Sequence, residues 1–227
     1  AEIKVVAGPE KKSRVISQHE RKLTAWHEAG HAVVMHLLPD HDPVTRITII
    51  PRGQAGGMTI ALPEEDRSYL SKGYMEDQIV ALLGGRTAEE LCLGDISTGA
   101  SNDIQRATQI ARKMVASYGM SERIGTVCFD SGHEEVFIGR TMAQGRSYSE
   151  TVAAEIDEEI KRVVGEAGAR CRSLLESHRA QLDAVAQYLL QHETMEREEF
   201  VAVFDQPDAQ KAEQPAELPV EKQEPQL

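Results

Sequence analysis

The stretch that most constrains this chain is Trp-His-Glu-Ala-Gly-His at residues 26–31, inside an amphipathic run over residues 23–38. It contains the pattern His-Glu-x-x-His. At about 100° per residue, His27 and His31 lie about 40° apart on one face of a helix, so both imidazoles can bind one metal ion. Glu28 lies beside them, where it can take a proton from a metal-bound water. The motif predicts two ligands and a base, and leaves the third ligand to be found elsewhere.

Zinc is the metal that such a set favours. Two imidazoles, one carboxylate and a water make a tetrahedral site with an open position. Zinc lowers the pKa of its water toward ~7, and Glu28 can then act as the base and later pass the proton to a leaving amine. This chemistry is peptide hydrolysis. The alternative is a metal-free helical interaction domain, in which the two histidines pack beside Trp26 and Glu28 is a solvated carboxylate.

Composition excludes several other functions. The net charge of −12 argues against a nucleic-acid partner, because binding a polyphosphate requires a basic surface. The three cysteines are far apart and form no Cys-x-x-Cys pair, which argues against a disulfide framework or a cysteine zinc site. No apolar run approaches the ~18 residues of a membrane-spanning helix. The chain as given is therefore expected to be soluble.

Hydrophobic periodicity predicts a mainly α fold with a small β-hairpin element. Ser17 and Glu20 fit a capping box that opens the helix of the metal motif, and this helix should end near Leu38 because Pro39 follows. Two β-rich runs around a Gly-rich loop predict the hairpin, at residues 44–50 and 58–62. Further helices are expected at residues 69–93 with an interruption at Gly84-Gly85, at 101–118, from a capping box at 147–150 to about 178, at 179–191 and at 195–204. A second short hairpin is expected from residues 126–129 and 136–138.

The chain divides into three parts. Residues 1–16 have no clear period and form a lead-in, and residues 17–204 form one domain. Residues 205–227 contain repeated proline and no aromatic side chain, which predicts a disordered acidic C-terminal tail.

The third ligand does not come from the motif helix itself. The metzincin extension would require glycine and histidine where this chain has Val34 and Leu37. His36 cannot replace them, since it lies nine residues after His27 and points about 180° away on the helix. We therefore interpret His36 as a packing or surface residue and look for the ligand elsewhere.

The remaining candidates for the third ligand are carboxylates. Glu64 and Glu65 follow a proline in a predicted loop, whereas Glu89 and Glu90 lie near the end of a helix. Asp103 lies at a helix start behind a glycine-containing loop. Spacing alone leaves Asp103 and the Glu89/Glu90 pair almost equal.

Five segments together are similar to a known family. They are HEAGH at 27–31, HDPV at 41–44, IIPRG at 49–53, GGRTAEE at 84–90 and STGASND at 97–103. They resemble the peptidase domain of the FtsH-type membrane-anchored ATP-dependent (AAA+) zinc metalloproteases, over residues 4 to 204. In that family the aspartate of the last segment is the third zinc ligand, so the resemblance implies this role for Asp103. Residues 54–57 (QAGG) depart from the Ala-Leu-Gly of many relatives.

The resemblance also implies the wider function. The chain would be the proteolytic half of a hexameric protease that degrades unfolded and membrane proteins at the cytoplasmic face of the cell membrane, with one Zn²⁺ per chain. The lead-in at residues 1–16 resembles the end of an AAA+ ATPase module. Because the chain has no Gly-x-x-x-x-Gly-Lys-Ser/Thr loop, ATP is expected to be used by the missing ATPase, and membrane contact is expected only through the missing N-terminal part.

The second predicted strand is the candidate for substrate binding. An edge strand can pair with an extended peptide through main-chain hydrogen bonds, which tolerate any sequence. The residues assigned to this substrate strand are Met58, Thr59, Ile60, Ala61 and Leu62. The alternatives are an ordinary edge strand and, for the whole domain, a hexameric scaffold or binding module that does not cut. Glu28 favours the enzyme, because a scaffold has no need of a base.

Overall fold

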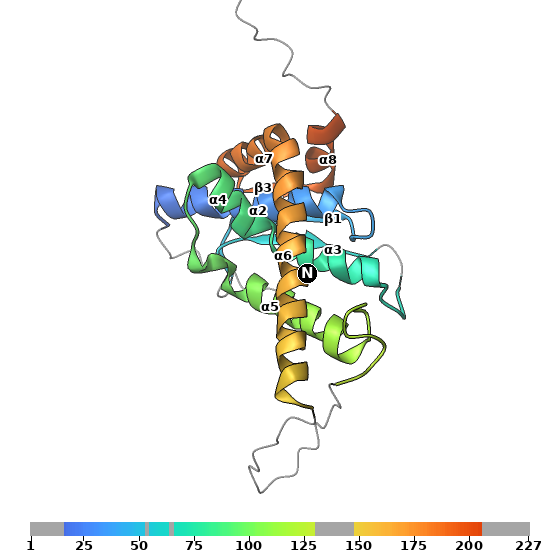
Figure 1. The fold of residues 1–227 in the computed structure, drawn as a ribbon. Coiled ribbons are helices and arrows are strands. Elements are labelled where there is room, and N and C mark those ends of the chain that lie inside the picture. The colour runs from blue at the N-terminus through green and yellow to red at the C-terminus, as the bar shows by residue number, and fades with distance from the viewer. Residues whose placement is uncertain (1–15, 53–54, 64–65, 130–147, 206–227) are drawn as a thin grey trace, which may run out of the picture.

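The computed structural model describes residues 16–52, 55–63, 66–129 and 148–205 (Figure 1). The predicted mainly α fold with a small β element is confirmed. The helices are α2 (Gln18–Leu37), α3 (Lys72–Leu82), α4 (Gly84–Leu93), α5 (Ser101–Arg112), α6 (Glu150–Ser177), α7 (Arg179–His192) and α8 (Arg197–Asp205). The strands are β1 (Val44–Thr48), β2 (Met58–Ala61) and β3 (Thr194–Glu196). The lead-in at residues 1–15 and the acidic tail from residue 206 lie outside the described residues.

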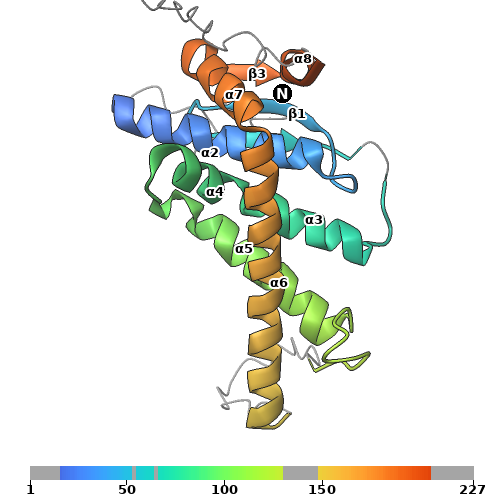
Figure 2. The same ribbon diagram turned by 45° about the horizontal axis from the view of Figure 1, so that its top comes forward.

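Helix α2 begins and ends close to where the sequence predicts. The Ser17 side chain accepts a hydrogen bond from the Glu20 main-chain N–H at 3.1 Å, which caps the first turn. Leu38 leaves the helical region with φ −90° and ψ 125°, as expected for a residue before proline. The helix lies between α7 and the sheet on one side and α4 and α5 on the other (Figure 2). Trp26 fixes it to α7, because its indole N–H donates to Asp183 Oδ1 at 3.0 Å.

The predicted helix at residues 69–93 is two helices, α3 and α4, with the break at Leu83, directly before the expected glycines. Its start is wrong, because α3 begins only at Lys72. The glycines permit a close approach of α4 to α2. A Cβ on Gly30 would lie 2.4 Å from the carbonyl oxygen of Gly84, and a Cβ on Gly84 would lie 2.7 Å from the carbonyl oxygen of Gly30. Side chains at these two positions would therefore force the helices apart.

The predicted pairing of residues 44–50 with 58–62 is confirmed as the antiparallel strands β1 and β2. Ile47 lies opposite Thr59, and β2 is at the edge of the sheet order β2-β1-β3. The prediction of helix from residue 195 is wrong at its start, because β3 occupies Thr194–Glu196 and α8 begins only at Arg197. Strand β3 forms by pairing with β1, where Met195 lies opposite Ile47, and both side chains are buried. This pairing joins segments about 150 residues apart, so the residues near position 195 show no strand pattern of their own.

Helix α5 follows a 3₁₀ turn at Thr98–Ala100 and continues through a π-helical turn at Lys113–Ser117, in line with the predicted helix. Gly119 follows with φ 61°, the left-handed conformation expected at a helix end. The strand predicted at residues 126–129 is wrong. That segment is irregular, and its Phe129 N–H bonds to the carbonyl of Ala116 at 2.8 Å. The expected partner at residues 136–138 lies outside the described residues.

Helix α6 crosses the other helices along the length of the molecule in both views (Figures 1 and 2). It packs on α2, α3, α4 and α5 and covers the core that these helices share. Its N-cap is Ser149, whose side chain accepts from the Val152 N–H at 3.3 Å. No helix in the described part of the chain is long and apolar enough to cross a membrane.

Candidate metal centre

Two imidazoles of α2 face each other at the centre of the molecule. The Nε2 atoms of His27 and His31 lie 3.1 Å apart, and their rings meet edge to face with centroids separated by 4.7 Å. The two residues are one helical turn apart, as the His-Glu-x-x-His spacing predicts. Both rings therefore present the same nitrogen to the same point.

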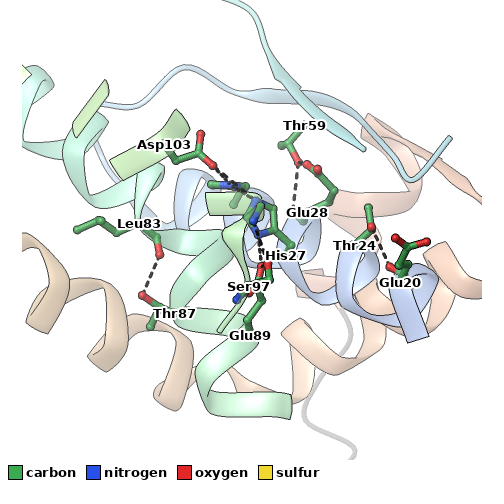
Figure 3. A network of polar contacts seen from close by, with 12 residues as sticks. Glu20, Thr24, His27, Glu28, Thr59, Leu83, Thr87, Glu89, Ser97 and Asp103 are labelled. Carbon is green, nitrogen blue, oxygen red and sulfur yellow. Dashed lines mark hydrogen bonds and ion pairs between the residues drawn. The ribbon is translucent and has the colours of Figure 1, made fainter. Parts of the chain in front are cut away.

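Asp103 approaches this point from the first turn of α5. Its Oδ2 atom lies 3.6 Å from His27 Nε2 and 3.5 Å from His31 Nε2 (Figure 3). The 3₁₀ turn before α5 places Asp103 at this point. The Ser97 side chain caps that turn by accepting a hydrogen bond from the Gly99 N–H at 3.1 Å. The structure thus brings together a histidine pair and a carboxylate that are about seventy residues apart in the chain.

The three atoms fit a small divalent cation. Ligands ~2.0 to 2.2 Å from one zinc ion at the tetrahedral angle lie about 3.3 to 3.5 Å apart. The observed separations of 3.1, 3.5 and 3.6 Å are close to this value. Within the described ranges, His27, His31 and Asp103 form the one group of three or more histidine, cysteine or acidic residues whose ligand atoms are close enough to hold one metal ion.

The Nδ1 atoms of the two imidazoles form hydrogen bonds on the side away from the candidate metal position. His31 Nδ1 lies 2.8 Å from the carbonyl oxygen of Ala81, and His27 Nδ1 lies 2.6 Å from Glu89 Oε1. A carbonyl oxygen can only accept, so His31 Nδ1 carries the hydrogen and its Nε2 keeps a lone pair for a metal. The carboxylate of Glu89 favours the same arrangement at His27.

Glu89 therefore lies behind His27 rather than beside the third-ligand position. Its side chain is fully buried, and Oε2 accepts from the Ser97 main-chain N–H at 2.7 Å. The Ser97 hydroxyl donates to Oε1 at 3.1 Å. In Figure 3 Asp103 and Glu89 lie on opposite sides of the His27 ring. Glu89 thus ties His27 to the turn that carries Asp103.

The other candidates for the third ligand lie elsewhere. Glu90 points to the outside of α4, where it pairs with Arg172 at 2.7 Å. His36 packs against Phe200 edge to face and against Phe204 with a tilted ring, with centroids 5.3 and 4.2 Å apart, which is the packing role expected for it. Glu64 and Glu65 lie outside the described residues.

A glycine makes room for the His27 ring. A Cβ on Gly85 would lie 2.5 Å from ring atoms of His27. Any side chain at position 85 would therefore displace the imidazole from Glu89. The glycine pair at the α3–α4 break thus permits both the helix crossing and the orientation of His27.

The charges of the site favour a cation. Burial lowers the pKa of His27, but the nearby carboxylates of Asp103 and Glu89 outweigh this effect and raise the pKa to about 10. Burial raises the pKa of Asp103, yet the contacts with His27 and His31 outweigh this and hold it well below its usual range. The carboxylates of Asp103 and Glu89 thus favour positive charge at the place where a divalent ion would bring it.

Glu28 lies beside the histidines and is almost completely buried, with 6% of its surface exposed. Burial raises the pKa of this carboxyl, and the neighbouring His31 and His27 and the Thr59 hydroxyl lower it in part. The Thr59 hydroxyl lies 2.8 Å from Glu28 Oε2, and Figure 3 shows Thr59 reaching Glu28 from β2. A buried carboxyl with a raised pKa is suited to take up and return a proton.

These groups line a cleft of about 650 Å³ between α2, the β2 segment (residues 55–61, which include strand β2) and the start of α5. Met58 and Thr59 of the predicted substrate strand line it, together with Gly56 and Gly57 before them. Leu62 follows β2 and is 53% exposed. Sequence reasoning missed the Thr59 hydroxyl and the Ser97 contacts, because both depend on how distant elements pack.

Comparisons with known proteins identify the family of the chain. The model of peptidase family M41 matches residues 14–203. The ATP-dependent zinc metalloprotease FtsH 1 of Thermoanaerobacter sp. (strain X514) is 58% identical over 205 residues, which are 90% of this chain and 34% of that protein. FtsH 2 of Alkaliphilus metalliredigens (strain QYMF), with the same description, is 56% identical over 88% of this chain and 29% of its own length. The chain spans about a third of the length of these relatives.

Proposed function

The chain belongs to peptidase family M41, and we propose that residues 17–204 are a zinc-dependent endopeptidase domain, the proteolytic part of an ATP-dependent protease. The observation that carries this proposal is the meeting of His27 Nε2, His31 Nε2 and Asp103 Oδ2 at one point, with the carboxylate of Glu28 beside them. We assign the three atoms as zinc ligands and Glu28 as the catalytic base.

Zinc, when bound, lowers the pKa of a coordinated water and polarises the peptide carbonyl. The proton transfers are then carried out by a protein side chain. Glu28 accepts the proton of the attacking water and delivers it to the nitrogen of the leaving amine. Its burial suits it to both steps, because a raised pKa brings the carboxyl closer to the operating pH.

Strand β2 supports the assignment of a substrate strand. One side of β2 pairs with β1, and no strand of the described residues pairs with its other side. Thr59 contacts Glu28, so a peptide added along this edge would lie beside the base. Main-chain pairing tolerates any substrate sequence, which suits unfolded or membrane-extracted proteins as substrates.

The wider assembly is proposed from the relatives. They are named ATP-dependent, and this chain has no phosphate-binding loop, so we assign ATP use to a module outside it. We likewise propose a homo-hexamer at the cytoplasmic face of the cell membrane, with membrane contact made by segments outside this chain. The alternative of a scaffold that does not cut leaves the buried Glu28 without a purpose.

The test combines metal analysis with cleavage. The chain loaded with zinc is incubated with an unfolded casein-like protein, and fragments are followed by mass spectrometry. We expect stoichiometric zinc and cleavage at internal bonds, and Glu28→Gln should keep the zinc while cleavage is lost. A zinc-loaded chain that leaves the unfolded substrate intact would contradict the proposal and favour the scaffold.

A further inference from the structure

We propose that the β2 segment aims the catalytic base: Thr59 holds one oxygen of Glu28, and Gly57 leaves space for the other, which takes the proton. This inference rests on the proposed peptidase function. Thr59 and Gly57 would then be positioning residues for the reaction, distinct from the metal ligands and from the base itself.

The Thr59 hydroxyl is the first half of the evidence. Its Oγ1 lies 2.8 Å from Glu28 Oε2 and 3.1 Å from the main-chain oxygen of Glu28. A carboxylate oxygen can only accept, so the hydroxyl is the donor. In the described part of the chain, no other donor reaches the Glu28 carboxylate. Oε2 therefore accepts a hydrogen bond from the protein, whereas Oε1 keeps its lone pairs for the proton of the attacking water.

Gly57 is the second half of the evidence, and it is independent of the hydroxyl. A Cβ at this position would lie 2.7 Å from both Cγ and Oε1 of Glu28. It would also lie 2.8 Å from Cγ2 of Thr24 on the same helix. The backbone of Gly57 does not have a positive φ, so its conformation does not require glycine. The glycine serves to leave room for the free oxygen of the base.

The Thr59 hydroxyl is anchored by the sheet. Thr59 lies opposite Ile47 of β1, whose side chain is completely buried, and β1 is also paired to β3. A donor on a fixed strand does not have to reorganise when the proton moves, which is how positioned groups accelerate a reaction. Because β2 is also the proposed substrate strand, one element would place both the peptide and the base.

The test uses three variants of the zinc-loaded chain and a short fluorogenic peptide. Thr59→Val removes the hydroxyl and keeps the shape, and we expect kcat to fall by about 10- to 100-fold. We expect KM and zinc affinity to stay within about threefold of the original, since neither the substrate edge nor the ligands change. Thr59→Ser keeps the donor and should restore most of kcat. Thr108→Val is the matched control, since it removes a hydroxyl that bonds only to its own helix at Ile104.

Gly57→Ala gives a second approach that does not touch the hydroxyl. We expect a fall in kcat with zinc retained. Crystal structures of Thr59→Val and Gly57→Ala should show the Glu28 carboxylate rotated, with His27, His31 and Asp103 in place. This readout does not depend on activity.

Three results would overturn the inference: an unchanged kcat in Thr59→Val, a carboxylate that stays in place in both variants, or loss of zinc from Thr59→Val. An inactive original chain with full zinc would instead contradict the proposed peptidase function. The two failures are therefore distinguishable.

Discussion

Two clefts of similar size lie on this molecule, and the buried carboxylates in them have different kinds of partner. The cleft at the metal centre holds about 650 Å³, and the cleft between α3 and α6 holds about 540 Å³. In the second cleft each buried carboxylate has an arginine. Glu159 binds Arg162 at 2.7 Å, and the neighbouring Asp77 binds Arg170 at 2.6 Å.

At the metal centre the carboxylates face histidines and a hydroxyl instead. Asp103 faces His27 and His31, and Glu28 has the Thr59 hydroxyl. An arginine keeps its charge at any ordinary pH and holds its partner in one state, whereas histidine can lose its proton and bind a metal. The two clefts are similar in size, but the partners of their buried carboxylates differ, and this difference sets the candidate metal centre apart from the arginine-paired cleft.

The largest expected effect comes from removing the carboxylate that faces the histidines. Asp103→Asn should lose most of its zinc, because an amide is a much weaker ligand than a carboxylate and leaves the two imidazoles to hold the ion. Metal content measured by mass spectrometry after dialysis checks this. Normal zinc in Asp103→Asn would reject Asp103 as a ligand.

A slightly smaller effect should follow from neutralising the base. Glu28→Gln keeps the size of the side chain and the three ligands, so zinc should stay bound. Loss of general-base catalysis should lower kcat by about 10²- to 10⁴-fold. The pair of variants separates metal binding from proton transfer, since the first loses zinc and the second keeps it. Equal zinc loss in both would show that Glu28 supports the metal and not the chemistry.

The sequence was sufficient for the parts of this site that are local. The His-Glu-x-x-His spacing and the Ser17 cap predicted the site helix, because ligand spacing and capping depend on residues within one or two turns. Spacing could not separate Asp103 from Glu89. Both lie in or next to helices, and only the crossing of α4 on α2 puts Glu89 behind the imidazole. The family resemblance supplied the choice that local physics left open.

Contacts between distant segments were not predictable in the same way. Strand β3 forms because Met195 pairs with Ile47, and nothing near residue 195 indicates a strand. Thr59 fits an alternating strand pattern, but its contact with Glu28 requires β2 to lie across α2. Such contacts follow from tertiary packing, which overrides local propensity.

A third prediction concerns the carboxylate behind His27. Glu89→Gln should weaken zinc affinity or activity by about 10- to 100-fold, because the carboxylate orients the ring and raises its basicity. Glu90→Gln is the matched control on the same helix, since Glu90 is half exposed and pairs only with Arg172. A chelator competition assay measures both. If the two variants behave alike, the contact of Glu89 with His27 has no role in metal binding.

The smallest effect is expected in the arginine-paired cleft and concerns stability alone. Arg162 chiefly, with help from the Ser121 hydroxyl and against the effect of burial, lowers the pKa of Glu159 from 4.5 to about 2. A carboxyl whose pKa is lower in the folded state stabilises the fold above its unfolded pKa, and this contribution is lost as the pH falls through the folded value. Glu159→Gln should therefore cost about 1 to 3 kcal/mol of unfolding free energy at neutral pH. The difference from the original chain should shrink between pH 4.5 and about 2.

Urea unfolding of both proteins across this pH range, with a chelator present so that metal release does not contribute, measures the difference. Cleavage by the zinc-loaded Glu159→Gln chain at neutral pH should equal that of the original, because Glu159 touches neither the ligands nor Glu28. A pH-independent difference would show that Glu159 stabilises α6 through packing and not through its charge. A loss of activity would show that the two clefts are coupled through α6, and the contrast between a structural and a reactive cleft would fail.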